Sequence, residues 1–154
     1  MQTKKSKIFK SALLIVLGVI IAFFISEFFR RKIGGFAGSY PFAKSWDFAY
    51  SLDSLQLSLE DLRNESPKLF CSIDTLSFEK DHTGYWYKIQ FCYENKAVNA
   101  LVTDRGQQSA LILVSIINND DFKIKLINRD FGFLANRREI KAFEKHVLQA
   151  LKKN

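Results

Sequence analysis

An unbroken apolar run near the N-terminus limits how this chain can fold more than any other feature. The fourteen residues from Ala12 to Ile25 carry no polar side chain. With its flanks the run covers residues 8–29, twenty-two residues that span roughly 33 Å as a helix. The hydrocarbon core of a bilayer is about 30 Å thick. We therefore expect a transmembrane helix over residues 8–29, with Lys10 and Glu27 near enough to its ends to reach the two interfaces.

Two other structures fit an apolar run of this length. A cleaved signal peptide also has basic residues followed by an apolar segment. Here, however, Phe28-Phe29 and Arg30-Arg31-Lys32 follow the run, and the nearest small-residue cleavage pattern, GGFAGS, lies beyond these charges. A buried core helix would be apolar on every face, and a chain of 154 residues has little core to cover it. The pattern favours a retained anchor.

The chain's excess of basic residues flanks this run. Of the net charge of +7, residues 1–32 contribute +6 and residues 33–154 contribute only +1. The membrane-flanking cations are Lys4, Lys5, Lys7, Lys10, Arg30, Arg31 and Lys32. A nucleic-acid-binding domain is expected to carry positive charge on its folded surface, so the pattern argues against nucleic acid as a partner. The positive-inside rule slightly favours a cytoplasmic N-terminus and an extracytoplasmic domain, and the reverse orientation stays open.

The sequence divides into four regions. A short basic tail, residues 1–7, precedes the transmembrane anchor, residues 8–29. A juxtamembrane linker, residues 30–44, contains three of the seven glycines and one of the two prolines. A small domain occupies residues 45–154.

The first part of this domain is predicted to be helical. Ser45 is expected to cap a helix that runs through WDFAYSLDSLQLSLEDLRNE and ends before Pro67. Its apolar stripe at helical spacing is Leu52, Leu55, Leu59 and Leu62. Leu57 also alternates with its leucine neighbours as in a strand, and Ser58 with Asp61 forms a second capping pattern. A break or bend is therefore expected there.

From residue 69 to residue 128 the apolar period changes to two, which predicts strands. The expected strands are LFCSIDTLSFEK, YWYKIQFCYE, AVNALVT, SALILVSII and FKIKLIN, joined by short turns. The continuous apolar run of SALILVSII indicates a central strand, and the lysines of FKIKLIN suit an edge. A last amphipathic helix presents Ile140, Phe143, Val147, Leu148 and Leu151 on one stripe. The predicted fold is α+β: an anchor, a helix, an antiparallel meander of about five strands, and a C-terminal helix packed on the sheet.

The two cysteines, Cys71 and Cys92, fall in adjacent strands of one predicted hairpin. A loop of Asp81-His82 places them directly opposite each other, where they can bond. A loop of His82-Thr83 places them diagonally on one face, and a three-residue loop places them on opposite faces. Two half-buried free thiols are the commoner outcome, and a disulfide is the alternative, which would favour an exported domain.

The sequence supplies few groups for catalysis or metal binding. His82 and His146 are the only histidines, and neither lies at a metal-ligand spacing from a second ligand. No GxSxG, phosphate-binding loop, GxGxxG or HExxH pattern occurs. We therefore assign no catalytic residue, cofactor or metal ligand, and expect no small-molecule substrate.

Two stretches are rich in side chains that are enriched at protein interfaces, aromatic residues in the first and aromatic residues with arginine in the second. One surrounds Trp86, and the other is the segment from Arg129 to Arg138. The candidate interface residues are Trp86, Arg129, Phe131, Phe133, Arg137 and Arg138. The alternative is that the phenylalanines fill the base of the sheet.

These features predict a single-pass membrane protein that contacts the bilayer through residues 8–29. Its domain is expected to be a non-catalytic protein-binding module, most simply an accessory subunit or assembly factor of a membrane complex. One alternative is a membrane-tethered inhibitor or immunity protein that neutralises a toxin or an enzyme. A second alternative is a small membrane-bound enzyme that uses a histidine.

Overall fold

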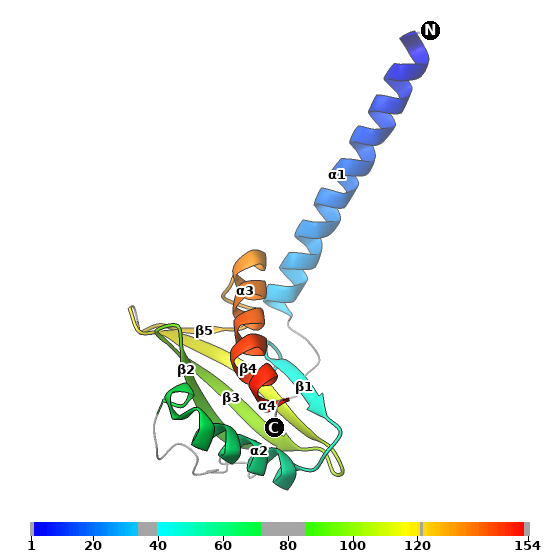
Figure 1. Ribbon diagram of the computed structural model, residues 1–154. Coiled ribbons are helices and arrows are strands. Elements are labelled where there is room, and N and C mark those ends of the chain that lie inside the picture. The colour runs from blue at the N-terminus through cyan, green and yellow to red at the C-terminus, as the bar shows by residue number, and fades with distance from the viewer. Residues whose placement is uncertain (1, 34–39, 72–85, 121, 153–154) are drawn as a thin grey trace.

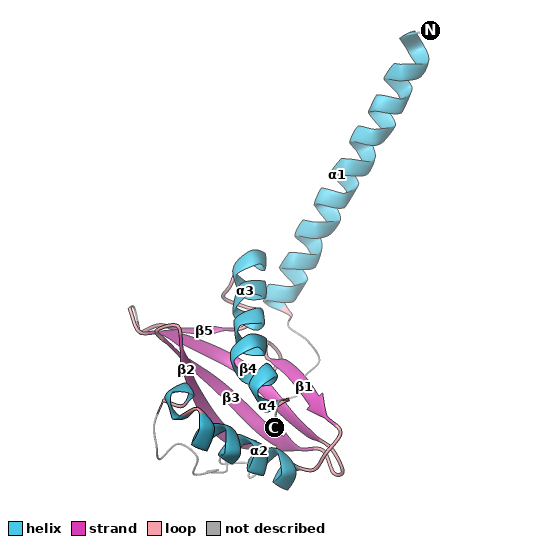
Figure 2. Ribbon diagram, viewed as in Figure 1, coloured by secondary structure: helices cyan, strands magenta, loops and turns pink. Residues whose placement is uncertain are grey.

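A computed structural model describes residues 2–33, 40–71, 86–120 and 122–152 of the chain. Figure 1 shows a long helix, α1, that projects from a twisted sheet, and Figure 2 shows that the remaining helices lie against one face of that sheet. The helices are α1 (Gln2–Lys32), α2 (Leu52–Glu65), α3 (Phe133–Phe143) and α4 (Gln149–Leu151). The strands are β1 (Lys44–Phe48), β2 (Trp86–Tyr93), β3 (Lys96–Asp104), β4 (Ser109–Asn118) and β5 (Ile124–Leu126). The predicted α+β fold is confirmed.

The sheet is antiparallel with β4 at its centre. The strand order is β1-β4-β3-β2, and β5 also pairs with β4. One edge of β4 pairs with β3 along its length. The other edge pairs with β1 at Ser109–Leu113 and with β5 at Ser115–Ile117. The central place of β4 and the edge position of β5 confirm the two strand predictions.

The helix predicted to begin at Ser45 starts later, and β1 takes its place. Trp46 and Phe48 pack on the main core while Asp47 between them is exposed, so the period over this segment is two. The ring of Trp46 stacks on Phe143 at 5.2 Å between centroids. Burial of these aromatic side chains against the sheet favours the strand over a first helical turn.

Helix α2 begins at Leu52 because Ser51, not Ser45, caps it. The Ser51 hydroxyl accepts a hydrogen bond from the Ser54 backbone N–H at 3.4 Å. Of the predicted break or bend at Ser58, the break is wrong: α2 is continuous, and the Ser58 hydroxyl donates to the Ser54 carbonyl within the helix. The helical leucine stripe is confirmed by three fully or almost fully buried members, Leu55, Leu59 and Leu62.

The predicted strand over residues 69–80 falls mostly outside the described residues. Of its described residues, Leu69 ends a 3₁₀ turn, η1 (Pro67–Leu69), and Phe70 forms an isolated antiparallel bridge with Phe91 of β2. The described sheet has five strands because β1, which was not predicted, is one of them. The DHTG turn, with His82, also falls outside the described residues.

The C-terminal helical stretch forms as predicted, with one local irregularity. A π-helical turn, η3 (Glu144–Leu148), lies between α3 and α4. Phe143, Val147, Leu148 and Leu151 are buried against the sheet and α2, while Ile140 is partly buried. The main core lies between the sheet and its helices; a smaller cluster of Leu101, Ala110 and Ile112 lies on the sheet's other face.

Helix α1 extends from the domain as a rod with its apolar side chains exposed (Figure 1). Over Phe9–Lys32 it is long and apolar enough to cross a membrane, by length and composition. None of its most apolar stretch is buried in the structure. Such a helix is compatible with a single-pass anchor and with a signal sequence.

Candidate functional site at the base of the apolar helix

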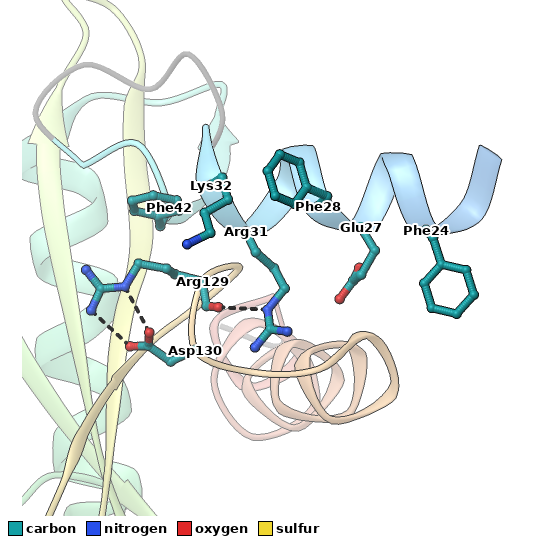
Figure 3. Close-up of a pocket in the computed structure, with 8 residues that line it drawn as sticks. All are labelled: Phe24, Glu27, Phe28, Arg31, Lys32, Phe42, Arg129 and Asp130. Carbon is teal, nitrogen blue, oxygen red and sulfur yellow. Dashed lines mark hydrogen bonds and ion pairs between the residues drawn. The ribbon is translucent and has the colours of Figure 1, made fainter. Parts of the chain in front are cut away.

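The last turns of α1 lie against the loop that joins β5 to α3. The Arg30 guanidinium donates from Nη2 to the Phe131 carbonyl at 2.9 Å. Arg31 donates from Nε to the Arg129 carbonyl at 3.1 Å (Figure 3). We use the term junction for the residues that make these contacts and the neighbouring ones described below: Phe23, Glu27, Arg30, Arg31, Arg129, Phe131 and Phe133.

An ion pair within α1 orients Arg30 toward the domain. Its Nε donates to Glu27 Oε2 at 2.9 Å, and its Nη2 bonds to Glu27 Oε1 as well as to the loop. The two side chains are only 22% and 17% exposed. Arg30 Nη1 is buried and has no hydrogen-bond partner among the described residues. Charged groups at this depth need partners, so the pair and the loop carbonyl form one polar unit at the end of an apolar helix.

An aromatic contact extends the junction further into the apolar part of α1. The rings of Phe23 and Phe133 meet edge to face, with centroids 5.4 Å apart. Phe23 lies within the predicted membrane span, whereas Phe133 begins α3. The domain therefore contacts α1 over about two turns, from Phe23 to Arg31.

Two asparagines fix the loop that receives α1. Asn128 has a positive φ of 62°, a conformation that asparagine tolerates better than most residues. Its N–H donates to Asn136 Oδ1 at 2.8 Å, and Asn136 Nδ2 donates back to Asn128 Oδ1 at 2.7 Å. Asn128 Nδ2 also donates to the Phe42 carbonyl at 3.0 Å. The carbonyls that accept from α1 are thus held by a network reaching α3 and the segment before β1.

Asp130 completes this loop. Its carboxylate accepts from the Leu126 backbone N–H at 2.8 Å and pairs with Arg129 at 2.9 Å. The hydrogen bond from Arg129 lowers the pKa of Asp130 below its ordinary value, so the carboxylate stays ionised. A cavity of about 820 Å³ lies between α1 and this loop, and Arg129, Asp130, Phe24 and Phe28 are among its lining residues. Figure 3 draws these residues and the bonds between Arg129 and Asp130.

The structure brings some of the predicted interface residues together and separates others. Arg129, Phe131 and Phe133 meet at the junction, where Phe131 packs on the main core and Phe133 contacts α1 instead. Arg137 and Arg138 lie exposed along α3. Trp86 lies apart from them, on the sheet face away from the helices, where its ring meets Tyr40 at 5.4 Å.

The cysteines form a disulfide, with their Cα atoms 4.9 Å apart. The expectation of two free thiols is therefore wrong. The Cys71 N–H donates to the Gln90 carbonyl at 3.3 Å, which draws the chain after η1 along β2 and brings the two sulfurs together. The bond ties the segment that leaves α2 to β2.

His146 belongs to a separate polar cluster at the turn between β2 and β3. Its Nε2 lies 3.1 Å from Glu94 Oε1, and its ring stacks on Tyr93 at 4.7 Å. The hydrogen bond with His146 lowers the pKa of Glu94, and burial raises the pKa of Tyr93. Nearby, Lys96 pairs with the buried Glu139 at 2.9 Å. Among the described residues no group of three or more His, Cys, Asp and Glu side chains is placed to hold a metal.

Sequence reasoning missed the residues that build the receiving loop. Asn128 and Asn136 carry no motif, although an asparagine directly after a strand is a common signal for a left-handed turn. Glu27 was noted only as a tolerated charge near the helix end, yet it orients Arg30. Its spacing of three residues from Arg30 is the signal that could have found this pair.

Comparison with known proteins adds no relative. No protein-family model, curated protein or solved structure matches this chain. The function is therefore argued from the junction, the exposed apolar helix and the disulfide.

Proposed function

We propose that this protein is a single-pass membrane protein whose α+β domain is held at the membrane surface and binds another protein, as an accessory subunit or assembly factor of a membrane complex. The observation that carries the proposal is the junction. A signal peptide that is removed has no need of directional contacts with the folded domain. Here Arg30 and Arg31 bond to specific loop carbonyls and Phe23 packs on Phe133, which supports a helix that stays with the domain.

The exposure of α1 supports the bilayer as its surroundings. Its large apolar side chains from Phe9 to Phe29 are mostly half or more exposed. Leaving such a surface in water costs roughly 25 cal/mol for each Å² of apolar area. A bilayer removes this cost, and the charged ends of α1 then reach the two interfaces.

The disulfide supports an extracytoplasmic domain. Disulfides persist in oxidising compartments and are rare in the cytosol. The four lysines at the other end of α1, Lys4, Lys5, Lys7 and Lys10, agree with a cytoplasmic N-terminus. In this orientation α1 is a signal-anchor, inserted and retained.

Fixing a small domain at the bilayer favours protein binding there. An anchor raises the local concentration of the domain near other membrane proteins, so a modest interface suffices. The turn from β4 to β5 and the first residue of β5 expose two large apolar side chains, Phe122 at 77% and Ile124 at 63%. We place part of the partner contact at this turn, which extends beyond the sheet (Figure 1).

The test is affinity capture of the full chain in mild detergent from the cells that make it, followed by mass spectrometry. We expect one or more membrane proteins in stoichiometric amounts. The double variant Phe122→Ser, Ile124→Ser should lose them, whereas Leu57→Ser, at an equally exposed leucine of α2, should retain them. Absence of any stoichiometric partner overturns the proposal.

A second variant separates an accessory subunit from a tethered inhibitor. In it the residues of α1 from Ala12 to Ala22 are reordered at constant composition, so that Phe23 and the rest of the junction are kept. An accessory subunit that also packs its anchor within the complex should lose its partner. Unchanged capture would contradict the accessory-subunit proposal, because an inhibitor needs the anchor only as a tether.

A further inference from the structure

The start of α3 presents two exposed apolar side chains beside the membrane helix. Phe133 is 42% exposed and Leu134 is 79% exposed. We call these two residues the apolar tip. Phe133 is the residue whose ring meets Phe23 of α1 at 5.4 Å. The apolar tip is therefore level with the apolar part of α1 and not with its charged end.

The position of Phe23 gives an approximate depth for this tip. Phe23 precedes Phe29, the last residue of the predicted span, by six residues, which correspond to about 9 Å along a helix. Amphipathic segments that lie in a membrane interface bury their apolar side about 5–10 Å into the boundary between headgroups and acyl chains. When α1 spans the bilayer, the tip falls within this depth.

A basic cavity of about 720 Å³ lies directly beside the tip. Four cations line it, of which Arg30 is already paired with Glu27, and Glu144 is the one acid among its lining residues. Trp46 Nε1 donates to Glu144 at 3.3 Å, which engages one of its oxygens. We call this the basic cavity, lined by Arg30, Lys44, Arg137 and Lys141.

The apolar tip and the basic cavity follow each other along one face of α3. Phe133, Arg137 and Lys141 are spaced by four residues, so they share that face in order from the tip toward the domain. A bilayer presents acyl chains and then phosphates in the same order, moving from its centre to its surface. The order of apolar and then basic side chains along α3 therefore matches the order of acyl chains and phosphates at a membrane interface.

We propose that the start of α3 is a second membrane contact, in which the apolar tip inserts at the edge of the acyl region and the basic cavity binds the phosphate of an anionic lipid. The inference rests on the proposed function, since it needs α1 to span the bilayer. Together with α1 this contact fixes the rotation and tilt of the domain. Basic side chains near an anionic surface strengthen such binding.

Spin labelling of the full chain in lipid nanodiscs tests the insertion. The nitroxide is placed at Leu134→Cys, at Val16→Cys within α1, and at Leu57→Cys as an exposed control on α2. The disulfide leaves Cys71 and Cys92 unlabelled. We expect labels at 134 and 16 to collide more with oxygen than with a water-soluble nickel complex, and the label at 57 to show the reverse.

The outcomes separate this inference from the proposed function. A label at 134 in water with a label at 16 in lipid overturns the second contact and leaves the anchor intact. Labels at both positions in water overturn both proposals. A label at 134 shielded from both reagents means that protein covers the tip, which also overturns the inference.

Lipid selectivity tests the basic cavity. Spin-labelled phosphatidylglycerol and phosphatidylcholine are compared for their association with the full chain in nanodiscs. We expect a several-fold preference for phosphatidylglycerol that falls to nearly none in the double variant Arg137→Gln, Lys141→Gln, because each cation near an anionic surface contributes about 1 kcal/mol, or roughly five-fold in affinity. The control Lys68→Gln, Lys88→Gln, at exposed basic residues elsewhere, should keep it. An unchanged preference in Arg137→Gln, Lys141→Gln overturns the lipid site.

Discussion

At the residue scale, Arg30 contributes both a positive charge and directional hydrogen bonds. It is a basic flank of an apolar helix, which the positive charge of the segment predicts, and it is also a directional donor to the Phe131 carbonyl. A lysine could supply the charge but not the planar fork that engages Glu27 and a carbonyl together. The side chain thus connects the end of the apolar helix with the loop of the domain.

Replacing Asn136 tests the network that holds the receiving loop. Asn136 is 5% exposed and exchanges two hydrogen bonds with Asn128. In Asn136→Ala the Asn128 N–H loses its buried acceptor, so the free energy of unfolding should fall by about 1–3 kcal/mol. Denaturant unfolding of the full chain in detergent measures this. Asn64→Ala, at the exposed end of α2, should change it by less than about 0.5 kcal/mol, and equal losses would contradict the account.

We expect the free energy of unfolding to depend on pH through the ionisation of Glu94. The His146 hydrogen bond lowers the pKa of Glu94 from its ordinary 4.5 in the folded state. Its contribution is therefore complete above pH 4.5 and is lost as the pH falls through the lowered value. Since Glu94 is half exposed, we expect an effect below about 1 kcal/mol.

The measurement compares unfolding free energies of the parent and Glu94→Gln as a function of pH. Their difference should be constant above pH 4.5 and shrink on acidification. Glu60→Gln, at an exposed carboxylate of α2, controls for the loss of one charge. A parent–variant difference that grows toward acid pH would contradict the assignment.

Sequence reasoning at this scale identified the candidate residues better than their contacts. Composition points to Arg129, Phe131 and Phe133 as a surface for a partner protein, which stays a prediction; in the structure their segment contacts α1, and Phe131 also packs on the main core. Their contact with α1 could not be derived, because it depends on how the chain returns from β5 to the end of a distant helix. The paired Asn128 and Asn136 are equally a product of tertiary packing.

At the scale of elements, helices and strands with a strong apolar period were predicted correctly, and a short strand was not. The leucine stripe of α2 and the alternation in β2 both match their buried faces. The five residues of β1 were missed, since a strand this short is defined by its partner β4 and by the Trp46–Phe143 stack. Local propensity cannot report such partners.

The disulfide should stabilise the attachment of the chain after α2 to the sheet. Cys71 and Cys92 are separated by 21 positions, and closing a loop of this size contributes about 2–4 kcal/mol. The variant Cys71→Ser, Cys92→Ser should lower the free energy of unfolding by that amount. Reduction of the parent should produce a similar loss, and no further loss in the variant. Equal stability of oxidised and reduced parent would contradict this role.

At the scale of the whole molecule, we expect the contacts of the junction to hold the helix and the domain in one relative orientation. The account predicts a narrow distribution of distances between spin labels at Val19→Cys on α1 and Glu60→Cys on α2, measured in nanodiscs. Arg30→Ala removes the bond to the loop and leaves Glu27 without its partner, so the distribution should broaden. Lys32→Ala, an exposed neighbour, should leave it narrow. A broad distribution in the parent would contradict a fixed junction.

The proposed function requires that α1 remains part of the working protein. The intact mass of the protein recovered, without an added tag at its N-terminus, from the membranes of the cells that make it tests this directly. We expect a mass that includes α1, in a membrane fraction that resists extraction by alkaline carbonate. A protein that begins after residue 33 and is released into the soluble fraction would contradict it.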